Sequence, residues 1–361
     1  MIRLASLIKQ HETDFLARYG QHLLPSQRNA LAAIKSCRSV HSPRMKTACN
    51  DCQHTAYVPH SCGHRHCPHC QAHESQAWID KQCQKCLPAD YFMMTFTLPK
   101  ELRPLAYAHQ RQVYSLLFKC AWDTLRTFSL NDKSLAGTPG MVAVLHTHSR
   151  RLDYHPHLHT LIPAAAIHKK QRLWRKKTGG YLFPHKAIAK VFRAKMLQMI
   201  QQLGLTLPFN IPEKWVVNVK QVGSGDKAII YLGRYLYRGV IQEKDILSHQ
   251  QGKVTFRYTE SKTQQVKTRT IDAVDFIWLV LKHVLPQRFR RSRDYGLLHP
   301  NSKKLIQVLY YQLKLALPIS KPRPRPVLRC PCCGGTMAIV QTRIRSKFSR
   351  LTAVPIAGAT H

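Results

Sequence analysis

The stretch from Leu152 to Ile162 places a histidine on every second residue. These are His155, His157 and His159, and Leu158 between the last two is apolar. Alternate side chains of a β-strand point to the same face, so the sequence predicts that the three imidazoles project from one surface. Two neutral imidazoles at neighbouring positions on one face form a clamp for a divalent metal ion. The alternative is that this strand is simply a polar surface, and the stretch alone does not separate the two interpretations.

The charge of the chain is strongly unbalanced. Its 361 residues include 56 Lys and Arg but only 18 Asp and Glu, which gives a net charge of +38. Such a surface repels itself unless a polyanion is the usual partner, so the composition favours DNA or another nucleic acid. The sequence has no signal-peptide pattern and no apolar run long enough to span a bilayer. We therefore expect a soluble cytoplasmic protein without a membrane partner.

Most of the twelve cysteines stand in Cys-x-x-Cys pairs, which in a chain without a secretion signal indicates metal binding in a reducing compartment. The pairs Cys49/Cys52 and Cys67/Cys70 are predicted to close one tetrahedral, structural zinc site. Because so small a segment buries little core, the metal would stabilise it. Alternative or additional ligands lie in the loop between the two pairs, at Cys62, His64 and His66.

Two further cysteine motifs are less clear. Cys83 and Cys86 stand three apart in an apparently helical stretch without a matching pair nearby, and we interpret them as structural or incidental. Cys330 and Cys333 form half of a zinc knuckle, and no second half follows them in the sequence. This half-knuckle either borrows ligands from elsewhere or binds nothing.

The remaining patterns predict a mixture of helices and strands. We expect helices over 1–46, 75–87, 101–130, 182–204, 226–238 and 275–285. Strands are expected over 91–99, 141–146 and 215–220, with a hairpin from 253–258 and 267–271. The strand at 141–146 is predicted to pair antiparallel with the histidine strand, and 318–326 is a Pro-rich linker.

Tyr231 and Tyr235 are four residues apart in the helix expected at 226–238. Side chains at this spacing lie on one helix face, about 5–6 Å apart at the backbone. The alternative is a pair of ordinary core or interface aromatics. Their neighbours Arg234 and Arg238 carry guanidinium groups suited to phosphate.

A basic segment with interleaved aromatic residues follows between Gln287 and Tyr295. It contains Arg290 and Arg291, and such a composition suits a strand of nucleic acid with stacked bases. The alternative is a solvated, charged surface.

Together these features indicate a specific chemistry. A divalent ion held by His157 and His159 would polarise a scissile phosphate. The hydroxyl of Tyr231 or Tyr235 could then attack phosphorus, which gives a covalent 5′-phosphotyrosine and a free 3′-hydroxyl. A second tyrosine one helical turn away permits a second transfer while the first covalent end is retained. This is the chemistry of a strand transferase rather than a simple nuclease.

Several motifs along the chain support a family resemblance. They are Arg18-Tyr-Gly20, Leu24-Pro-Ser26, Cys37-Arg, Ser61-Cys62, His66-Cys67-Pro-x-Cys70, Tyr91-Phe, Phe96-Thr-Leu-Pro99, Leu152-Asp-Tyr-His-Pro-His-Leu-His159, Tyr231-Leu-Gly-Arg-Tyr235, Val254-Thr-Phe-Arg-Tyr258, His283-Val-Leu-Pro286 and Tyr295-Gly-Leu-Leu298. Over nearly its whole length the chain resembles the HUH two-tyrosine transposases of the rolling-circle insertion-sequence family ninety-one.

The resemblance implies an α+β fold, in which helices flank an HUH-type antiparallel sheet and a small N-terminal domain binds zinc. It implies that His157 and His159 bind Mg²⁺ or Mn²⁺ and that Tyr231 and Tyr235 are the catalytic tyrosines. The partners would be single-stranded transposon ends and target DNA in the bacterial cytoplasm, at the nucleoid. The implied domains are a helical and zinc-binding one at 1–88, a catalytic one at 89–300, and a basic linker with a cysteine knuckle at 301–361.

The sequence departs from this family at the residues that follow the strand at 141–146. Members commonly have Trp-Gly-Gln where this chain has His148-Ser-Arg150. If that glutamine completes the metal site, another residue must replace it here. The candidates are His146, His148, Asp153 and His155.

Two other classes of protein share some of these features. A zinc-containing DNA-binding regulator without catalytic activity accounts for the charge and the cysteines, but leaves the histidine strand and the tyrosine pair as coincidences. A zinc hydrolase that uses His155, His157 and His159 would crowd three ligands from one short strand around a single ion, and it does not need the tyrosines.

Overall fold

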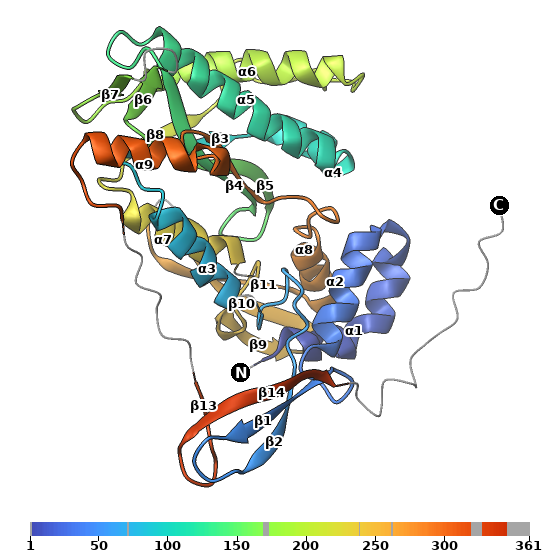
Figure 1. Cartoon of the computed structure of the whole chain (residues 1–361). Helices are drawn as coiled ribbons and strands as arrows, with labels where there is room; N and C mark the ends of the chain where they lie inside the picture. Colours follow the sequence, from blue (N-terminus) through green and yellow to red (C-terminus); the bar gives the residue numbers. More distant parts are fainter. Residues whose placement is uncertain are drawn as a thin grey trace, which may run out of the picture.

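The largest unit of the computed structural model is an antiparallel sheet of seven strands, in the upper half of Figure 1. The structure describes residues 2–70, 72–168, 173–237, 239–260, 263–318 and 327–344. The strand order is β7-β6-β4-β5-β3-β8, and β12 pairs with β4. The strands are β3 (Tyr91–Thr97), β4 (Thr138–His148), β5 (Tyr154–Pro163), β6 (Ala165–His168), β7 (Leu173–Lys176), β8 (Val217–Gln221) and β12 (Ser292–Gly296).

One face of this sheet is covered by three helices. They are α4 (Arg103–Ala108), α5 (Gln110–Asn131) and α6 (His185–Gln202). Phe96 and Leu158 point from neighbouring strands into the same fully buried cluster as Leu117 of α5 and Phe192 of α6. Burial of large apolar side chains of this kind stabilises a fold by about 1.5–3 kcal/mol per side chain.

The opposite face of the sheet packs against α3 (Ala72–Cys83), α7 (Asp226–Tyr237) and α9 (Lys303–Gln312). Val144 and Leu161 from the sheet share a core with Leu232 of α7 and Leu309 of α9. Because side chains alternate along a strand, His157 and His159 lie on this face, whereas Leu158 between them lies on the other. The histidines are therefore presented towards α7.

The N-terminal helices join a second core. α1 (Leu4–Tyr19) and α2 (Pro25–Ser36) pack with α8 (Ala273–Leu281) against a sheet of three strands. Its strands are β9 (Ile246–Gln250), β10 (Lys253–Thr259) and β11 (Val266–Asp272), and β10 pairs antiparallel with both neighbours. Phe15, Phe256 and Phe276 are buried together there.

A small four-stranded sheet combines two strands from the N-terminal part of the chain with two strands from the C-terminal part. Its order is β13-β14-β1-β2, with β1 (Arg44–Cys49), β2 (Thr55–Pro59), β13 (Leu328–Arg329) and β14 (Thr336–Ile344). We call this sheet the ribbon, and in Figure 1 it projects at the bottom of the molecule. Four short 3-10 helices complete the described elements, at Gly20–His22, Lys100–Leu102, Glu243–Asp245 and Pro300–Ser302.

The predicted fold class is confirmed, since antiparallel sheets flanked by helices give an α+β architecture. The predicted pairing of the histidine strand with the strand before it is also confirmed, as β4 pairs with β5. Two local predictions were wrong. The helix expected over 101–130 is divided at His109, which has φ −118° and ψ 45°, and the helical expectation for 1–46 fails from Cys37 onwards.

Contacts also cross the domain boundaries expected at 88 and 300. Within the C-terminal portion, α9 packs on the large sheet and β14 pairs with β1. The three-domain division remains a prediction. Most of the expected linker, 319–326, lies outside the described residues, and within those residues no helix is long and apolar enough to cross a membrane.

Candidate functional site

Three histidines meet on the face of the large sheet that is covered by α7. His157 and His159 come from β5, and His146 comes from β4. The antiparallel register pairs His146 directly with His157, and directly opposed residues point to the same face. One ring nitrogen from each of the three lies within 4.8 Å of the others. We call these residues the histidine cluster.

Hydrogen bonds engage one ring nitrogen of His157 and one of His159. His157 Nδ1 donates to the carbonyl oxygen of His155 at 2.7 Å, and His159 Nδ1 lies 3.1 Å from the hydroxyl of Thr95. Both Nε2 atoms therefore remain for another ligand. The Nε2 atom of His146 is buried and has no hydrogen-bond partner among the described residues. Histidines whose second nitrogen is held in this way are typical metal ligands, so the cluster fits a divalent ion.

Burial of the cluster favours the neutral form of its imidazoles. Burial lowers the pKa of His146 and His157 well below the usual value of 6.5, and it lowers the pKa of His159 to about 4. The imidazoles are therefore neutral at neutral pH. Neutral imidazole is the form that binds a metal.

Of the four candidates for the third ligand, His146 is the one that lies together with His157 and His159. The other three are engaged elsewhere: His155 with Arg103 at 2.6 Å, Asp153 with Arg269 at 2.9 Å, and His148 with Tyr235 at 2.8 Å. The zinc-hydrolase alternative, which needs His155 beside His157 and His159, does not fit this geometry, because His155 contacts Arg103 of α4 whereas His146 joins the other two from the adjacent strand.

Both predicted tyrosines lie against the histidine cluster on the same side of α7. The ring of Tyr235 stacks on His146, with centroids 3.6 Å apart and planes 16° apart. The centroid of Tyr231 lies 6.1 Å from that of His159 and 6.3 Å from that of Tyr235. Tyr231 is 44% exposed, whereas burial raises the pKa of Tyr235 above its usual range. The two phenols therefore have different environments.

The position of α7 depends on its packing against α3. Gly233, between the two tyrosines, is buried where Ile79 and Trp78 of α3 approach the helix backbone. The hydroxyl of Ser75 donates to the carbonyl oxygen of Gly233 at 2.8 Å. Since a Cβ atom at residue 233 would overlap Ile79, glycine permits this close approach.

The four arginines that were predicted to bind DNA differ in their exposure and in their contacts. The guanidinium of Arg291 donates to the carbonyl oxygens of Leu145 at 3.0 Å and Leu236 at 2.9 Å, and lies 5.7 Å from the ring centroid of Tyr235. Burial lowers its pKa to about 10. Arg291 thus connects β4 to α7 beside the tyrosines. Arg234 and Arg290 are exposed, and Arg238 lies outside the described residues.

A basic cleft of ≈ 990 Å³ lies on the other side of Arg291. Its cationic side chains are Arg65, Lys81, Arg111, Arg288, Arg290, Arg291 and Arg293. Phe289 also lines the cleft, but it is buried in the core beneath Arg293. The one carboxylate that lines it, Asp294, is neutralised by Lys85 at 2.7 Å. A smaller cavity of ≈ 290 Å³ lies beside the tyrosines and is lined in part by Arg150, Arg257 and Tyr258.

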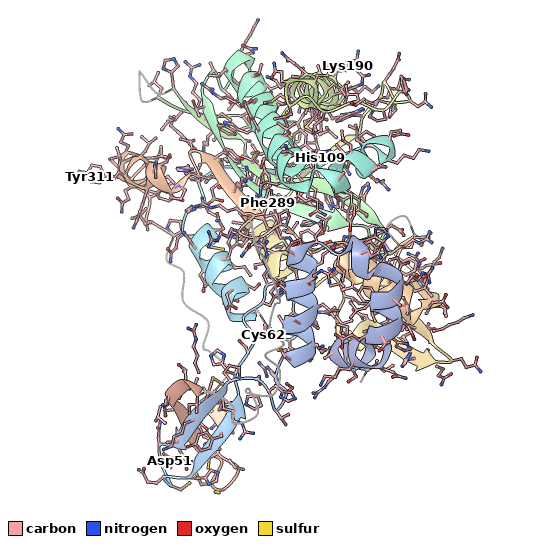
Figure 2. The ribbon with its side chains drawn as sticks, turned by 90° about the vertical axis from the view of Figure 1, so that its right-hand side faces the viewer. Asp51, Cys62, His109, Lys190, Phe289 and Tyr311 are labelled. Carbon is pink, nitrogen blue, oxygen red and sulfur yellow. The ribbon has the colours of Figure 1, made fainter. Side chains whose placement is uncertain are left out.

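The cysteines form two separate clusters, and this corrects the single site predicted from the two N-terminal pairs. Cys67 and Cys70 group with Cys37 and Cys62, whereas Cys49 and Cys52 group with Cys330 and Cys333. The reason is that β1 and β2 carry Cys49 and Cys52 away from the loop at 62–70. Figure 2 shows the separation, with Asp51 far out on the ribbon and Cys62 close to the helices.

The first cluster is held by sulfur atoms 3.6 Å apart, from Cys70 to Cys37 and from Cys70 to Cys62. Hydrogen bonding from Cys62 lowers the pKa of the Cys37 thiol to about 7, which favours the thiolate form that binds metals. Sequence analysis missed Cys37 as a ligand because it stands alone after α2, with no second cysteine at knuckle spacing. A lone cysteine carries no spacing signal.

Known proteins similar to this chain are transposases. Residues 140–305 match a family described as "Putative transposase", and residues 7–98 match one described as "Transposase zinc-binding domain". The "Putative transposase y4qJ" of Sinorhizobium fredii is 31% identical over 315 residues, which covers 79% of this chain and 79% of the relative. The "Transposase for insertion sequence element IS801" of Pseudomonas savastanoi pv. phaseolicola is 26% identical over 326 residues, with 80% and 76% covered.

Among solved structures, the conjugative relaxase TrwC in complex with oriT DNA, in a metal-bound form, is similar over 36% of this chain and 49% of that chain. The TM-score is 0.30 and the sequence identity is 17%.

Proposed function

Because this chain belongs to the IS91 transposases, the insertion-sequence family ninety-one, we propose that it cleaves and rejoins single-stranded DNA at the ends of its transposon through 5′-phosphotyrosine intermediates. One observation carries the proposal. Tyr231 and Tyr235 lie on one side of α7, directly over the histidine cluster. This is the arrangement that transfer of a phosphodiester to a phenol requires.

In the proposed step, the hydroxyl oxygen of one tyrosine attacks the phosphorus of the scissile bond. The tyrosine O–P bond forms while the bond from phosphorus to the 3′ oxygen breaks. The phenol gives up its proton, and the departing 3′ oxygen takes one. Rejoining is the reverse reaction with another 3′-hydroxyl, so no external energy source is needed.

A Mg²⁺ or Mn²⁺ ion held by His146, His157 and His159 would supply positive charge to the phosphate oxygens in this reaction. These ligands are neutral, so they leave the charge of the ion undiminished for the phosphate. Arg150, which lines the cavity beside both tyrosines, adds a fixed cation to the same region.

The residues around Tyr235 hold its hydroxyl in one orientation. His148 donates through Nδ1 to the carbonyl oxygen of Ser149 at 3.0 Å, so its Nε2 accepts the hydroxyl hydrogen of Tyr235 at 2.8 Å. Tyr231 is more exposed than Tyr235, and both line the small cavity. We propose that the two tyrosines act at different steps, with one retaining a covalent strand while the other reacts.

The basic cleft suits the strand that leads to or from the tyrosines. Its cationic side chains provide charge for a phosphate backbone. Phe289 is only 3% exposed and packs in the core, so it offers no face to bases. Arg290 is exposed at this cleft, in keeping with the predicted contact to nucleic acid, whereas Arg291 uses its guanidinium on carbonyl oxygens. DNA in the bacterial cytoplasm, at the nucleoid, is the proposed partner.

Covalent trapping tests the proposal directly. Labelled single strands tiled across the DNA that flanks the coding sequence are incubated with the purified protein and Mg²⁺ or Mn²⁺, and a denaturing gel reports any species carrying both label and protein. We expect an adduct that disappears with chelator and in the Tyr231→Phe/Tyr235→Phe double variant. Each single variant is expected to retain a different subset of the cleavage and joining products.

Two results would overturn this proposal. One is tight, salt-sensitive DNA binding with no adduct on any strand, which would favour a zinc-containing DNA-binding regulator. The other is normal cleavage and joining by both single variants and by the double variant, because the nucleophile would then lie elsewhere. Tyr258→Phe serves as a control, since this tyrosine lines the same cavity but is carried by β10 and not by α7.

A further inference from the structure

We propose that Cys49, Cys52, Cys330 and Cys333 bind a second structural Zn²⁺, which fastens the C-terminal hairpin to the N-terminal ribbon. The two family matches cover 7–98 and 140–305, so Cys330 and Cys333 lie outside both. This inference is independent of strand transfer. It assigns a role to the C-terminal half-knuckle that the sequence left without a partner.

The geometry of the four sulfur atoms fits zinc. The Sγ atoms of Cys49 and Cys333 are 3.5 Å apart, and those of Cys52 and Cys330 are 3.6 Å apart. Four thiolates at Zn–S distances of about 2.3 Å around a tetrahedron lie about 3.8 Å from one another. A disulfide would bring two sulfur atoms to about 2.05 Å, so these separations indicate a metal site.

Backbone amides next to each cysteine pair donate hydrogen bonds to sulfur, which favours the thiolate form that binds zinc. The amide of Asp51 donates to Cys49 Sγ at 3.4 Å, and the amide of Cys332 donates to Cys330 Sγ at 3.4 Å. The same turn occurs at both pairs, with an amide two residues after the first cysteine directed at its sulfur. Such hydrogen bonds stabilise negative charge on sulfur. Two knuckles thus face each other across the ribbon.

Strand pairing brings the two knuckles together. In the antiparallel register of β1 and β14, Cys49 is opposite Met337 and Ala48 is opposite Ala338. The amide of Asn50 donates to the carbonyl oxygen of Thr336 at 3.0 Å, which fixes the turn that carries Cys52. The cysteines that meet here are about 280 residues apart in the sequence.

The ribbon needs such a site because its own core is very small. Its buried apolar cluster consists of Cys49, Cys330 and Met337, with Ala56 partly buried beside them. A unit of this size does not bury enough apolar surface to be stable alone, and structural metals commonly supply the difference. Four thiolates occupy every position around a tetrahedral ion, so the site is structural and leaves no position for a substrate.

Zinc stoichiometry in cysteine variants tests the site. The zinc content of the full-length protein is measured by native mass spectrometry for the wild type, Cys49→Ser/Cys52→Ser, Cys330→Ser/Cys333→Ser and the combination of all four changes. We expect each double variant to contain one zinc fewer than the wild type, and the fourfold variant also to contain only one fewer. Cys332→Ser is the matched control and keeps the full content.

The same variants distinguish two separate zinc sites from one site shared by the four N-terminal cysteines. If all four N-terminal cysteines shared one site, then the Cys49/Cys52 and Cys67/Cys70 variants would lose the same ion. Combining those two pairs would then cost no second zinc, and the proposal would be wrong. We expect the combination to cost two. Full zinc content in Cys330→Ser/Cys333→Ser would equally refute a role for the C-terminal hairpin.

Thiol alkylation of the wild-type protein gives an answer that does not depend on folded variants. Cys332 and Cys333 are adjacent and both exposed, but only Cys333 belongs to the cluster. We expect Cys332 to react at once and Cys333 to react at least tenfold more slowly, until a chelator removes the metal. Equal rates at the two residues without chelator would show that no metal protects Cys333.

Discussion

Replacing Gly233 by alanine should impair strand transfer far more than it impairs folding. A Cβ atom at this position would lie 2.9 Å from Cδ1 of Ile79 and 3.0 Å from Cε3 of Trp78, and nearer still to Cγ1 of Ile79. Ordinary contacts begin at 3.4 Å, so α7 must move away from α3 by more than about half an ångström. Tyr231 and Tyr235 are carried on that helix and move with it.

The two effects have different magnitudes. Overpacking a core costs about 1–3 kcal/mol, whereas alanine gains about 1 kcal/mol over glycine inside a helix. The net loss of stability is therefore about 0–2 kcal/mol, which corresponds to at most roughly 8 °C in melting temperature. By contrast, a shift approaching 1 Å at reacting groups can reduce a rate by about a hundredfold. We expect Gly233→Ala to lower the adduct formation rate at least tenfold.

The assay combines single-turnover adduct formation with thermal unfolding. Lys227→Ala is the matched control, because this residue is exposed on the same helix and its change creates no overlap. In the double variant Gly233→Ala/Ile79→Ala the obstructing side chain is removed, and we expect the rate to recover at least partly even though Ile79→Ala itself costs about 2–5 kcal/mol. Unchanged activity in Gly233→Ala, or no recovery in the double variant, would refute this reasoning.

Two smaller perturbations test the supports of the site. Thr95→Val removes the hydroxyl that accepts from Nδ1 of His159, so the Mn²⁺ concentration for half-maximal cleavage should rise by about tenfold or more, whereas Thr95→Ser should resemble the wild type. His283 is buried, its Nε2 donates to the carbonyl oxygen of Leu152 at 2.8 Å, and burial lowers its pKa from 6.5 to about 4. The unfolded chain therefore binds this proton before the folded chain does, so stability is complete above pH 6.5 and falls as the pH drops towards 4. Between pH 7.5 and 5, the free energy of unfolding measured in urea should fall by about 2 kcal/mol more for the wild type than for His283→Gln. An equal fall in both proteins would contradict the lowered pKa of His283.

The parts of the site that the sequence predicts well are those set within a single element. His157 and His159 share a face because a strand alternates, and Tyr231 and Tyr235 share a side because a helix turns every 3.6 residues. Neither inference requires knowledge of the partner element. For the same reason the sequence left the third histidine open, since choosing His146 needs the register between β4 and β5.

The cysteines illustrate the opposite case. Spacing identifies Cys49/Cys52, Cys67/Cys70 and Cys330/Cys333 as pairs, but it carries no information on which pairs meet. That choice depends on the contact of β1 with β14, which joins the two ends of the chain, and on the position of Cys37 after α2. Long-range contacts of this kind follow from the whole fold and not from a local pattern.

The first cysteine cluster is linked to α7 indirectly, through the segment before β12 and through α3. The loop that carries its ligands docks on the segment before β12, where Arg65 donates to the carbonyl oxygens of Phe289 at 2.6 Å and Pro286 at 2.8 Å. α3 begins two residues after Cys70 and supplies the surface on which α7 rests.

A metal at this first cluster would therefore fix the start of α3, and α3 in turn fixes the height of the tyrosines above the histidine cluster. His69 adds a further anchor, since its Nε2 lies 2.9 Å from the carboxylate of Glu243 in the segment that follows α7. The N-terminal zinc-binding segment thus helps to hold α7 over the histidine cluster. Loss of its metal should shift α3 and with it the two tyrosines. Loss of the metal in the ribbon should leave the tyrosines in place, because the ribbon cysteines are not followed by a helix that packs on α7.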